Sequence, residues 1–322
     1  MSLATLSNPL RPALLAAGRS KRLERTVSKL GVTRKVVARF VPGEREDAVV
    51  SATAALLRSG RFVSVDYLGE DITDASQAEA TVQAYLSLLT AYATLDAPTD
   101  TAAAPLEVSI KLSALGQMLP DIGRQVALEN ARRICVAAGE VGAWVNVDAE
   151  DHTTTDSTLS IVRELREEFP TLGTVLQAYL HRTQDDCREL SGPGSRIRLC
   201  KGAYREPATV AFQGAAEVDN AYRRCLRILM QGEGYPMVAS HDPAMIEAAL
   251  AYAAEAGRSP QEYELQMLYG IRDLEQRRLA DSGQQLRVYV PFGDQWYGYF
   301  MRRLAERPAN VIFFLRSFLT RS

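Results

Sequence analysis

The chain has 322 residues, of which 47% are apolar and 24% charged, and its formal net charge is −2. This composition is typical of a folded globular protein, with enough length for one large α/β domain or two ordinary ones. The small net charge gives no field that would attract nucleic acid, so we expect no nucleic-acid partner. The longest apolar runs are far too short for a membrane span, and the N-terminus lacks the residue order of a signal peptide.

The cysteines and histidines point to neither a disulfide framework nor a metal centre. The four cysteines are scattered and contain no C-x-x-C pair, which is typical of reduced thiols in a cytosolic protein. They are Cys135, Cys187, Cys200 and Cys225. The three histidines lack the spacing of metal ligands, so we expect no metal site.

In chain order, the first predicted unit is an N-terminal helical arm over residues 1–60, which has no strand pattern. Within it, residues 19–40 (RSKRLERTVSKLGVTRKVVARF) are rich in Lys and Arg, with Glu24 as the only acid. Two interpretations stay open: a solvated arm, and an arm weakly attracted to an anionic membrane surface. We expect a cytoplasmic protein, with peripheral association with the inner face of the cell membrane as the open alternative.

From residue 61 to residue 322, short apolar or β-branched runs alternate with segments of helical periodicity. The eight runs are RFVSVDYL (61–68), LEVSIKL (106–112), AWVNVDA (143–149), GTVLQAYL (173–180), RIRLCKGA (196–203), YPMVASH (235–241), YELQML (263–268) and LRVYVPF (286–292). This rhythm predicts parallel βαβ units, and eight of them favour an α/β fold of the (β/α)8 TIM-barrel type. The alternative is an open doubly wound sheet, but no G-x-G-x-x-G follows the first run.

Polar and ionisable side chains concentrate where the predicted strands end. They are Asp66, Glu70, Lys111, Asp148, Glu150, Gln177, Arg198, Lys201, Ser240, His241, Asp242 and Tyr289. Any one of them could reach solvent or cap a helix, but charges in strands buried on both faces are costly unless paired or used. Because barrel enzymes place their chemistry at this end, we expect a site there. Arg198 and Lys201 would form a cationic patch beside Gly202 and Ala203, which suits an anionic ligand.

The last predicted helix, within QWYGYFMRRLAERP (295–308), carries two adjacent arginines. Helical spacing places Tyr299, Arg302, Arg303 and Glu306 on one face. One hypothesis is that this face is solvated, as is common for surface arginines. The other is that the arginines turn onto the barrel mouth and bind a carboxylate bidentately.

Seven segments together resemble the bacterial, single-function proline dehydrogenase family. They are VSIKLSALG, NVDAED, LQAYLHRT, RLCKGAYREP, ASHDP, YELQMLYG and YVPFGDQWYGYFMRRLAERPAN, in order between residues 62 and 310. The resemblance implies a (β/α)8 barrel, in agreement with the strand count. The chain has no room for the aldehyde dehydrogenase domain of larger relatives, so we expect a separate pyrroline-5-carboxylate dehydrogenase to act downstream.

The resemblance also implies the reaction and the cofactor. Family members bind FAD non-covalently and oxidise L-proline to Δ1-pyrroline-5-carboxylate, the first step of proline catabolism to glutamate, passing electrons to a quinone. Catalytic roles fall on Asp148 and Arg198.

By the same resemblance, each expected contact maps onto a residue of this chain. The expected substrate-binding residues are Lys111, Arg302, Arg303, Tyr289, Tyr299, Leu268 and Glu70, the last as an acid that gates the site with Arg302. The expected cofactor-binding residues are Ala149, Gln177, Arg198, Lys201, Gly202, Ala203, Ser240, His241 and Glu306. Arg205 departs from the family, because relatives can carry an apolar or aromatic residue there near the flavin.

Two other functions stay open from the residues alone. One is a flavin-free barrel lyase that uses Lys111 or Lys201 as a Schiff base, and the other is a non-catalytic binding barrel. For the oxidation itself, no histidine is placed as an obligate base. We therefore expect the proline ammonium to lose its proton to water before binding, with Asp148 positioning the substrate.

Overall fold

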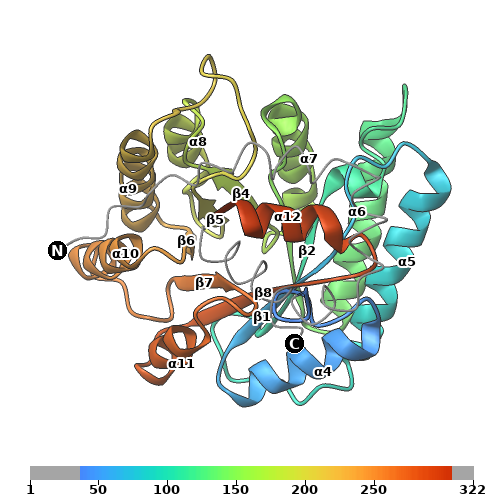
Figure 1. The fold of residues 1–322 in the computed structure, drawn as a ribbon, viewed down its shortest axis with the longest axis horizontal. Coiled ribbons are helices and arrows are strands. Elements are labelled where there is room, and N and C mark those ends of the chain that lie inside the picture. The colour runs from blue at the N-terminus through green and yellow to red at the C-terminus, as the bar shows by residue number, and fades with distance from the viewer. Residues whose placement is uncertain (1–36, 307–322) are drawn as a thin grey trace, which may run out of the picture.

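The computed structural model describes residues 37–306 and contains eight parallel strands closed into a barrel (Figure 1). The strands are β1 (Phe62–Tyr67), β2 (Leu106–Ile110), β3 (Trp144–Val147), β4 (Gly173–Gln177), β5 (Arg196–Cys200), β6 (Tyr235–Ala239), β7 (Glu264–Leu268) and β8 (Leu286–Phe292). β1 pairs with both β2 and β8, which closes the barrel. The predicted barrel and all eight strands are confirmed, and the open-sheet alternative is wrong.

Helices alternate with the strands and cover the outside of the barrel. They are α5 (Ala75–Tyr92), α6 (Gly123–Glu140), α7 (Thr155–Glu168), α8 (Thr183–Leu190), α9 (Ala215–Gln231), α10 (Pro243–Glu255) and α11 (Asp273–Asp281), with short 3-10 turns η1 (Leu112–Leu115) and η2 (His152–Thr154). A further helix, α12 (Trp296–Glu306), follows β8. Local sequence sets two of the starts. Asp74 caps α5 by accepting from the amides of Ser76 and Gln77, and Asp242 caps α10, whose first residue is proline.

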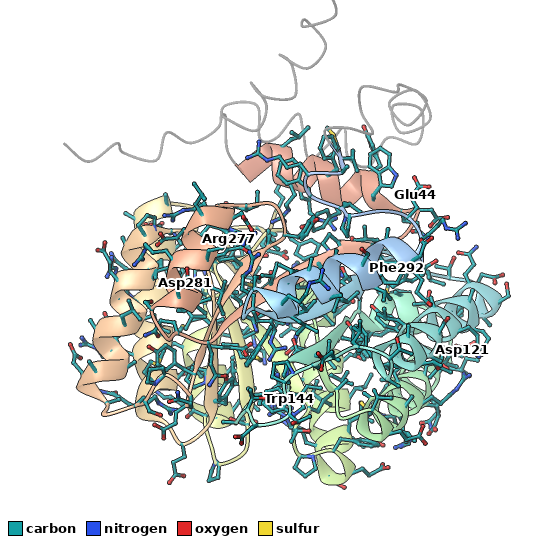
Figure 2. The ribbon with its side chains drawn as sticks, turned by 90° about the horizontal axis from the view of Figure 1, so that it is seen from below. Glu44, Asp121, Trp144, Arg277, Asp281 and Phe292 are labelled. Atoms are coloured by element: carbon teal, nitrogen blue, oxygen red, sulfur yellow. The ribbon has the colours of Figure 1, made fainter. Side chains whose placement is uncertain are left out.

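Two helices depart from simple alternation. α4 (Glu46–Arg58) precedes the first strand and packs outside the barrel against β1 and β8. α12 lies across the C-terminal ends of the strands instead of beside them, as Figures 1 and 2 show. In Figure 2, Trp144, the first residue of β3, marks the opposite end of the barrel.

The apolar side of α12 packs on the chain that leads into α4. Phe300 and Leu304 are buried in one cluster with Phe40, Val41 and Leu68. The ring centroids of Phe40 and Phe300 lie 6.2 Å apart. This contact fixes α12 above the barrel mouth, so its opposite face is turned toward the strand ends.

Most of the predicted N-terminal arm, including nearly all of the basic segment 19–40, lies outside the described residues. The division into an arm (1–60) and a barrel (61–322) therefore stays a prediction. Between residues 37 and 306, no helix has both the length and the hydropathy to cross a membrane.

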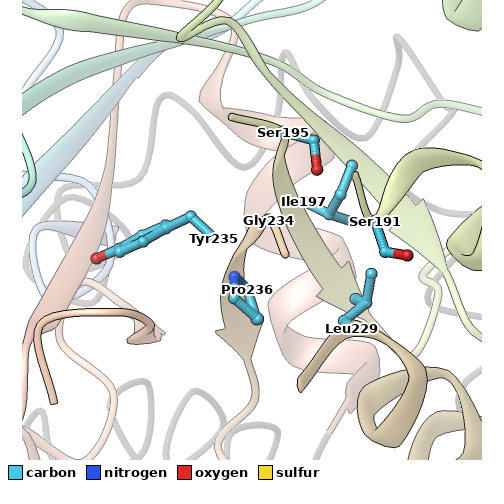
Figure 3. Close-up of a pocket in the computed structure, with 7 residues that line it drawn as sticks. All are labelled: Ser191, Ser195, Ile197, Leu229, Gly234, Tyr235 and Pro236. Carbon is cyan, nitrogen blue, oxygen red and sulfur yellow. The ribbon is translucent and has the colours of Figure 1, made fainter. Parts of the chain in front are cut away.

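The N-terminal end of the barrel interior is ionic, which the sequence did not lead us to expect. Arg287 binds Glu264 through Nε and Nη2, at 2.7 and 2.9 Å. Arg196 binds Glu107, and its guanidinium lies 3.7 Å from the ring centroid of Trp144. All four charged side chains are buried. A small pocket beside this layer, between β5, β6 and α9, is shown in Figure 3, and it lies away from the strand ends where the polar residues gather.

Glu264→Ala should strongly destabilise the fold, because it leaves the buried Arg287 cation without its carboxylate. Breaking a buried pair from one side typically costs about 3–5 kcal/mol. The surface pair of Glu79 with Arg133 provides a control, since Glu79→Ala should cost within about 1 kcal/mol. Urea unfolding of both variants measures the difference, and equal losses would contradict a special role for the buried pair.

Candidate active site

Four polar side chains meet inside the C-terminal end of the barrel. They come from β1, from the residue after β2, from the residue after β3, and from β8: Asp66, Lys111, Asp148 and Tyr289. Lys111 Nζ lies 2.6 Å from Asp66 and 3.5 Å from Asp148. The Tyr289 hydroxyl lies 2.7 Å from Asp66 and 2.8 Å from Asp148. A cation and a phenol thus join two carboxyl groups across the barrel.

The distances constrain where protons reside in this cluster. A phenol has one proton, so Tyr289 can donate to only one of the two carboxyl groups that it contacts. Burial, with a further contribution from Asp148, raises the pKa of Asp66 despite the neighbouring Lys111. Burial lowers the pKa of Lys111, but Asp66 and Asp148 outweigh it and the net shift is upward. The net effect on Asp66 is thus a raised pKa, while Lys111 stays an ammonium.

Arg198 connects this cluster to the ionic layer below. Its Nη1 donates to Ser109 and to Asp148, both at 2.8 Å, and its Nη2 donates to Glu107 at 2.7 Å. Ser109 in turn donates to the same Asp148 oxygen at 2.6 Å. Asp148 is therefore held in one orientation by two donors. Nε of Arg198 is buried and has no hydrogen-bond partner within residues 37–306.

The other expected cofactor residues line the rim formed by β3 to β7. Ala149, Gly202, Ala203, Ser240 and His241 are half-buried there, and Gln177 is buried. His241 Nε2 accepts from the Leu268 amide at 2.9 Å, which places its proton on Nδ1. Gly202 has φ of +116°, and a Cβ there would lie 2.4 Å from the ring of Tyr179. The fifth strand can therefore turn outward at this point only with glycine.

Lys201, expected from the sequence to form a cationic patch with Arg198, is paired with two acids. Its Nζ lies 2.5 Å from Asp219 and 2.8 Å from Asp242. Asp219 belongs to α9 and Asp242 caps α10, so the lysine joins the starts of two helices. Any charge that Lys201 offers to a ligand is shared with these two acids.

On α12, the face with the two arginines is not solvated, so that hypothesis is wrong. Tyr299 and Arg303 are buried, and the Arg303 guanidinium lies 5.0 Å from the Tyr299 ring centroid. Arg302 binds Glu70 bidentately, with Nη2 and Nη1 at 2.6 and 3.1 Å from the carboxylate oxygens. Burial lowers the pKa of Arg302, but Glu70, with smaller contributions from Tyr204 and Tyr289, outweighs it and the net shift is upward. The side chain of Glu306 lies outside the described residues.

Sequence reasoning missed three parts of this site. Asp66 was noted only as a strand-end residue, yet it is the partner of Lys111. Glu107 and Ser109 on β2 were not selected, although both contact Arg198. A signal was available, because Glu107, Ser109 and Lys111 alternate along the strand and share its inward face.

The comparisons with known proteins agree with this geometry. A family model described as "Proline dehydrogenase" matches residues 49–316. The chain belongs to the proline dehydrogenase family. A proline dehydrogenase from Deinococcus radiodurans is 40% identical over 283 residues, covering 87% of this chain and 89% of that protein. Proline dehydrogenase 1 from Bacillus subtilis (strain 168) is 36% identical over 310 residues, covering 96% of this chain and 99% of that protein.

Among solved structures, proline utilization A from Bdellovibrio bacteriovorus, inactivated by N-propargylglycine, is similar with a TM-score of 0.77 and 25% identity. The match covers 91% of this chain and 34% of that one, so this chain spans about a third of that protein's length. The family and the oxidoreductase class expected from the sequence are confirmed. Proline dehydrogenase family membership implies a flavin cofactor in general terms.

The geometry also weighs against one open alternative. A Schiff-base lyase needs a neutral, nucleophilic amine. Lys111 is instead bound to Asp66 at 2.6 Å, and the net effect of its surroundings is a raised pKa. This lysine is therefore suited to binding an anion and poorly suited to attacking a carbonyl.

Glu150, the second residue after Asp148, supplies a pH-dependent test. Burial raises the pKa of Glu150 from 4.5 to about 7, although Ser113 donates two hydrogen bonds to it. The folded protein thus holds this proton more tightly than the unfolded chain. Its contribution to stability is fully present below pH 4.5 and is lost as pH rises through about 7.

Because Glu150→Gln cannot ionise, its free energy of unfolding should increase relative to that of the wild type as pH rises across this range. The relative gain should reach about 2–3 kcal/mol and level off above it. Urea unfolding at pH 5, 6, 7 and 8 measures this difference. A constant offset between the two proteins over the whole range would show that Glu150 ionises normally.

Proposed function

We propose that this chain is an FAD-dependent dehydrogenase that oxidises L-proline to Δ1-pyrroline-5-carboxylate and passes the electrons to a quinone. The observation that carries the proposal is the bidentate contact of Arg302 with the Glu70 carboxylate above the polar cluster of the barrel mouth. It supports a site built to bind carboxylates, and two adjacent arginines on one helix suit a small amino acid.

In this proposal the substrate carboxylate is bound by Arg302, Arg303 and Lys111. All three are cations at the barrel mouth that are buried or half-buried there. Tyr289, Tyr299 and Leu268 form the walls around the ring. Glu70 orients the Arg302 fork and acts with it as a latch over the bound substrate. Planar guanidinium groups fix the orientation of a carboxylate as well as its position, which the reaction requires.

The residues present fit a flavin. Nε of Arg198 is a buried donor without a partner among the described residues, so a flavin acceptor atom would satisfy it. The rim adds the Gln177 amide, the Lys201 cation and the backbone around Gly202 and Ala203. We propose that these groups, with Ala149, Ser240 and His241, hold FAD non-covalently. Glu306 is part of the same proposal.

When bound, FAD supplies the hydride acceptor for the oxidation. Proline loses a hydride from C5 and a proton from nitrogen, and a C=N bond forms between these two atoms. The proton leaves to water before the substrate is bound, because among the described residues no histidine contacts Asp148 or Lys111. Asp148 positions the amine, held in place by Arg198 and Ser109. The positive charge of Arg198 favours electron gain at the site.

The test is made on the purified protein. We expect flavin absorbance, and proline-dependent reduction of a quinone analogue with formation of the imine product. A colourless protein that cannot be reconstituted with FAD, or one that is yellow but inert to proline, would overturn the proposal. Attraction of the basic segment 19–40 to anionic vesicles, and a separate downstream dehydrogenase, remain predictions.

Replacing either arginine should reduce proline turnover without unfolding the protein. Losing one charge-assisted hydrogen bond costs about 1.5–3 kcal/mol, or roughly ten- to a hundredfold in kcat/KM. Arg303→Lys should not restore activity, because an ammonium cannot reproduce the planar fork. Quinone-analogue reduction is measured with flavin content checked in each variant. Wild-type kcat/KM in Arg302→Met and Arg303→Met would contradict the carboxylate clamp.

Lys201→Ala should weaken flavin retention, because it removes a cation from the rim and leaves Asp219 and Asp242 without it. We expect lower FAD occupancy after dialysis and a shifted reduction potential. Arg277→Ala is the matched control, because Arg277 makes only a surface ion pair with Asp273. This variant should retain its flavin. Full occupancy and an unchanged potential in Lys201→Ala would remove this residue from the cofactor site.

A further inference from the structure

The loop after β1 carries an unusual backbone conformation next to Glu70. Asp71 has φ of +55°, in the left-handed region that residues other than glycine adopt only with support. Glu70 immediately precedes it and binds Arg302. The direction in which Glu70 points therefore depends on what holds Asp71 in this conformation.

Ser113 in η1 holds this loop at two consecutive residues. The Asp71 amide donates to Ser113 Oγ at 3.1 Å, and the Ile72 amide donates to the Ser113 carbonyl at 3.1 Å. Ser113 is itself almost fully buried. Two adjacent amides bound to one buried residue define the course of the loop.

Ser113 is fixed in turn by Glu150. The Ser113 amide donates to Glu150 Oε1 at 3.1 Å, and its hydroxyl donates to Oε2. The Glu150 carbonyl accepts from the Gln177 side chain at 2.7 Å, which ties it to β4. A continuous chain of hydrogen bonds thus runs from Gln177 through Glu150 and Ser113 to the residue after Glu70.

We propose that Glu150 and Ser113 are positioning residues that set where Glu70 meets Arg302, and so tune substrate binding at the barrel mouth. The part of the inference that concerns substrate rests on the proposed function. The part that concerns the loop rests only on the contacts above.

The charges around Glu150 support this assignment. Of the ionisable groups, Lys111 and Glu70, which follow β2 and β1, have the largest effects on the pKa of Glu150, and Glu150 in turn raises the pKa of Tyr204 after β5. Each Ser113 hydrogen bond lowers the pKa of Glu150 by more than Lys111 does, and the repulsion from Glu70, which raises this pKa, is weaker still. Ionised Glu150 accepts both Ser113 donors and makes Ser113 Oγ a better acceptor for the Asp71 amide. The contact to the loop should therefore strengthen as Glu150 loses its proton near neutral pH.

The first experiment measures amide hydrogen exchange of residues 69–74 in wild type, Ser113→Ala and Glu150→Gln. We expect about three- to tenfold faster exchange in Ser113→Ala and a smaller increase in Glu150→Gln, which keeps an acceptor. The matched control is Asn130→Ala, which removes a buried hydrogen bond to Leu115 on the same 3-10 turn but none to the loop. Unchanged exchange in Ser113→Ala, or an equal increase in the control, would overturn the proposal.

The second experiment is kinetic. Ser113→Ala should raise the KM for proline about three- to tenfold and change kcat by less than about twofold, with FAD content equal to wild type. Ser113→Thr keeps the hydroxyl and should restore most of the loss. Because proline itself must lose a proton before it binds, KM should fall as pH rises from 6 to 8 in both proteins, but the fall should be steeper in wild type than in Glu150→Gln. Parallel profiles would overturn the role of Glu150 ionisation.

A double-mutant cycle separates positioning from a general structural effect. In the Glu70→Ala background, Ser113→Ala should add little to KM, because the residue it positions is already absent. An undiminished effect there would overturn the proposal. If the wild type does not oxidise proline, the proposed function fails, and the exchange experiment still decides whether Ser113 and Glu150 hold the loop.

Discussion

The structure depends most on the buried guanidinium of Arg198, because it belongs to two layers of the barrel at once. Nη2 binds Glu107 in the ionic layer, and Nη1 binds Ser109 and Asp148 at the strand ends. Burying such a group is costly unless nearly every donor is satisfied. Here the partners come from β2, from the end of β3 and, through Ser64, from β1. The barrel must close in this register for the cation to be tolerated.

The same constraint orders the site before any ligand arrives. An Asp148 side chain that accepts from both Arg198 and Ser109 has little freedom, and Lys111 is held between Asp66 and Asp148. Electrostatic groups fixed in a low-dielectric interior need not reorganise during a reaction, which is the largest advantage that an enzyme has over water. The ionic interior is therefore costly for stability and useful for chemistry. An apolar interior of the same size would hold the strands but could not hold Asp148.

The sequence predicted the strands and the barrel correctly, but it did not predict which side chains contact one another. Strand runs such as RIRLC and LRVYV are recognisable because parallel strands buried on both faces need β-branched and apolar residues. Contacts between side chains far apart in the chain cannot be predicted from local residue spacing. Arg196 and Glu107 are 89 positions apart, and Lys201 meets Asp219 and Asp242 only because α9 and α10 begin beside the end of β5. The role of α4 as an outer helix over β1 and β8 could not be predicted either, because amphipathicity gives a helix a buried face but not its neighbour.

The adjacent arginines on α12 explain why an acidic residue, Glu70, stands at the barrel mouth. Arg302 is half-buried, and a cation taken out of water is costly unless a carboxylate pairs with it. The Glu70 carboxylate offsets this cost by accepting hydrogen bonds from both terminal nitrogens of Arg302. Arg302 is therefore held in one orientation, while Arg303 is restrained against Tyr299. Because the loop that carries Glu70 is bound by Ser113, a series of hydrogen-bonded residues links Arg302 to the strand ends. If the mouth binds a carboxylate as proposed, the Glu70–Arg302 pair would orient Arg302 for it before the substrate arrives.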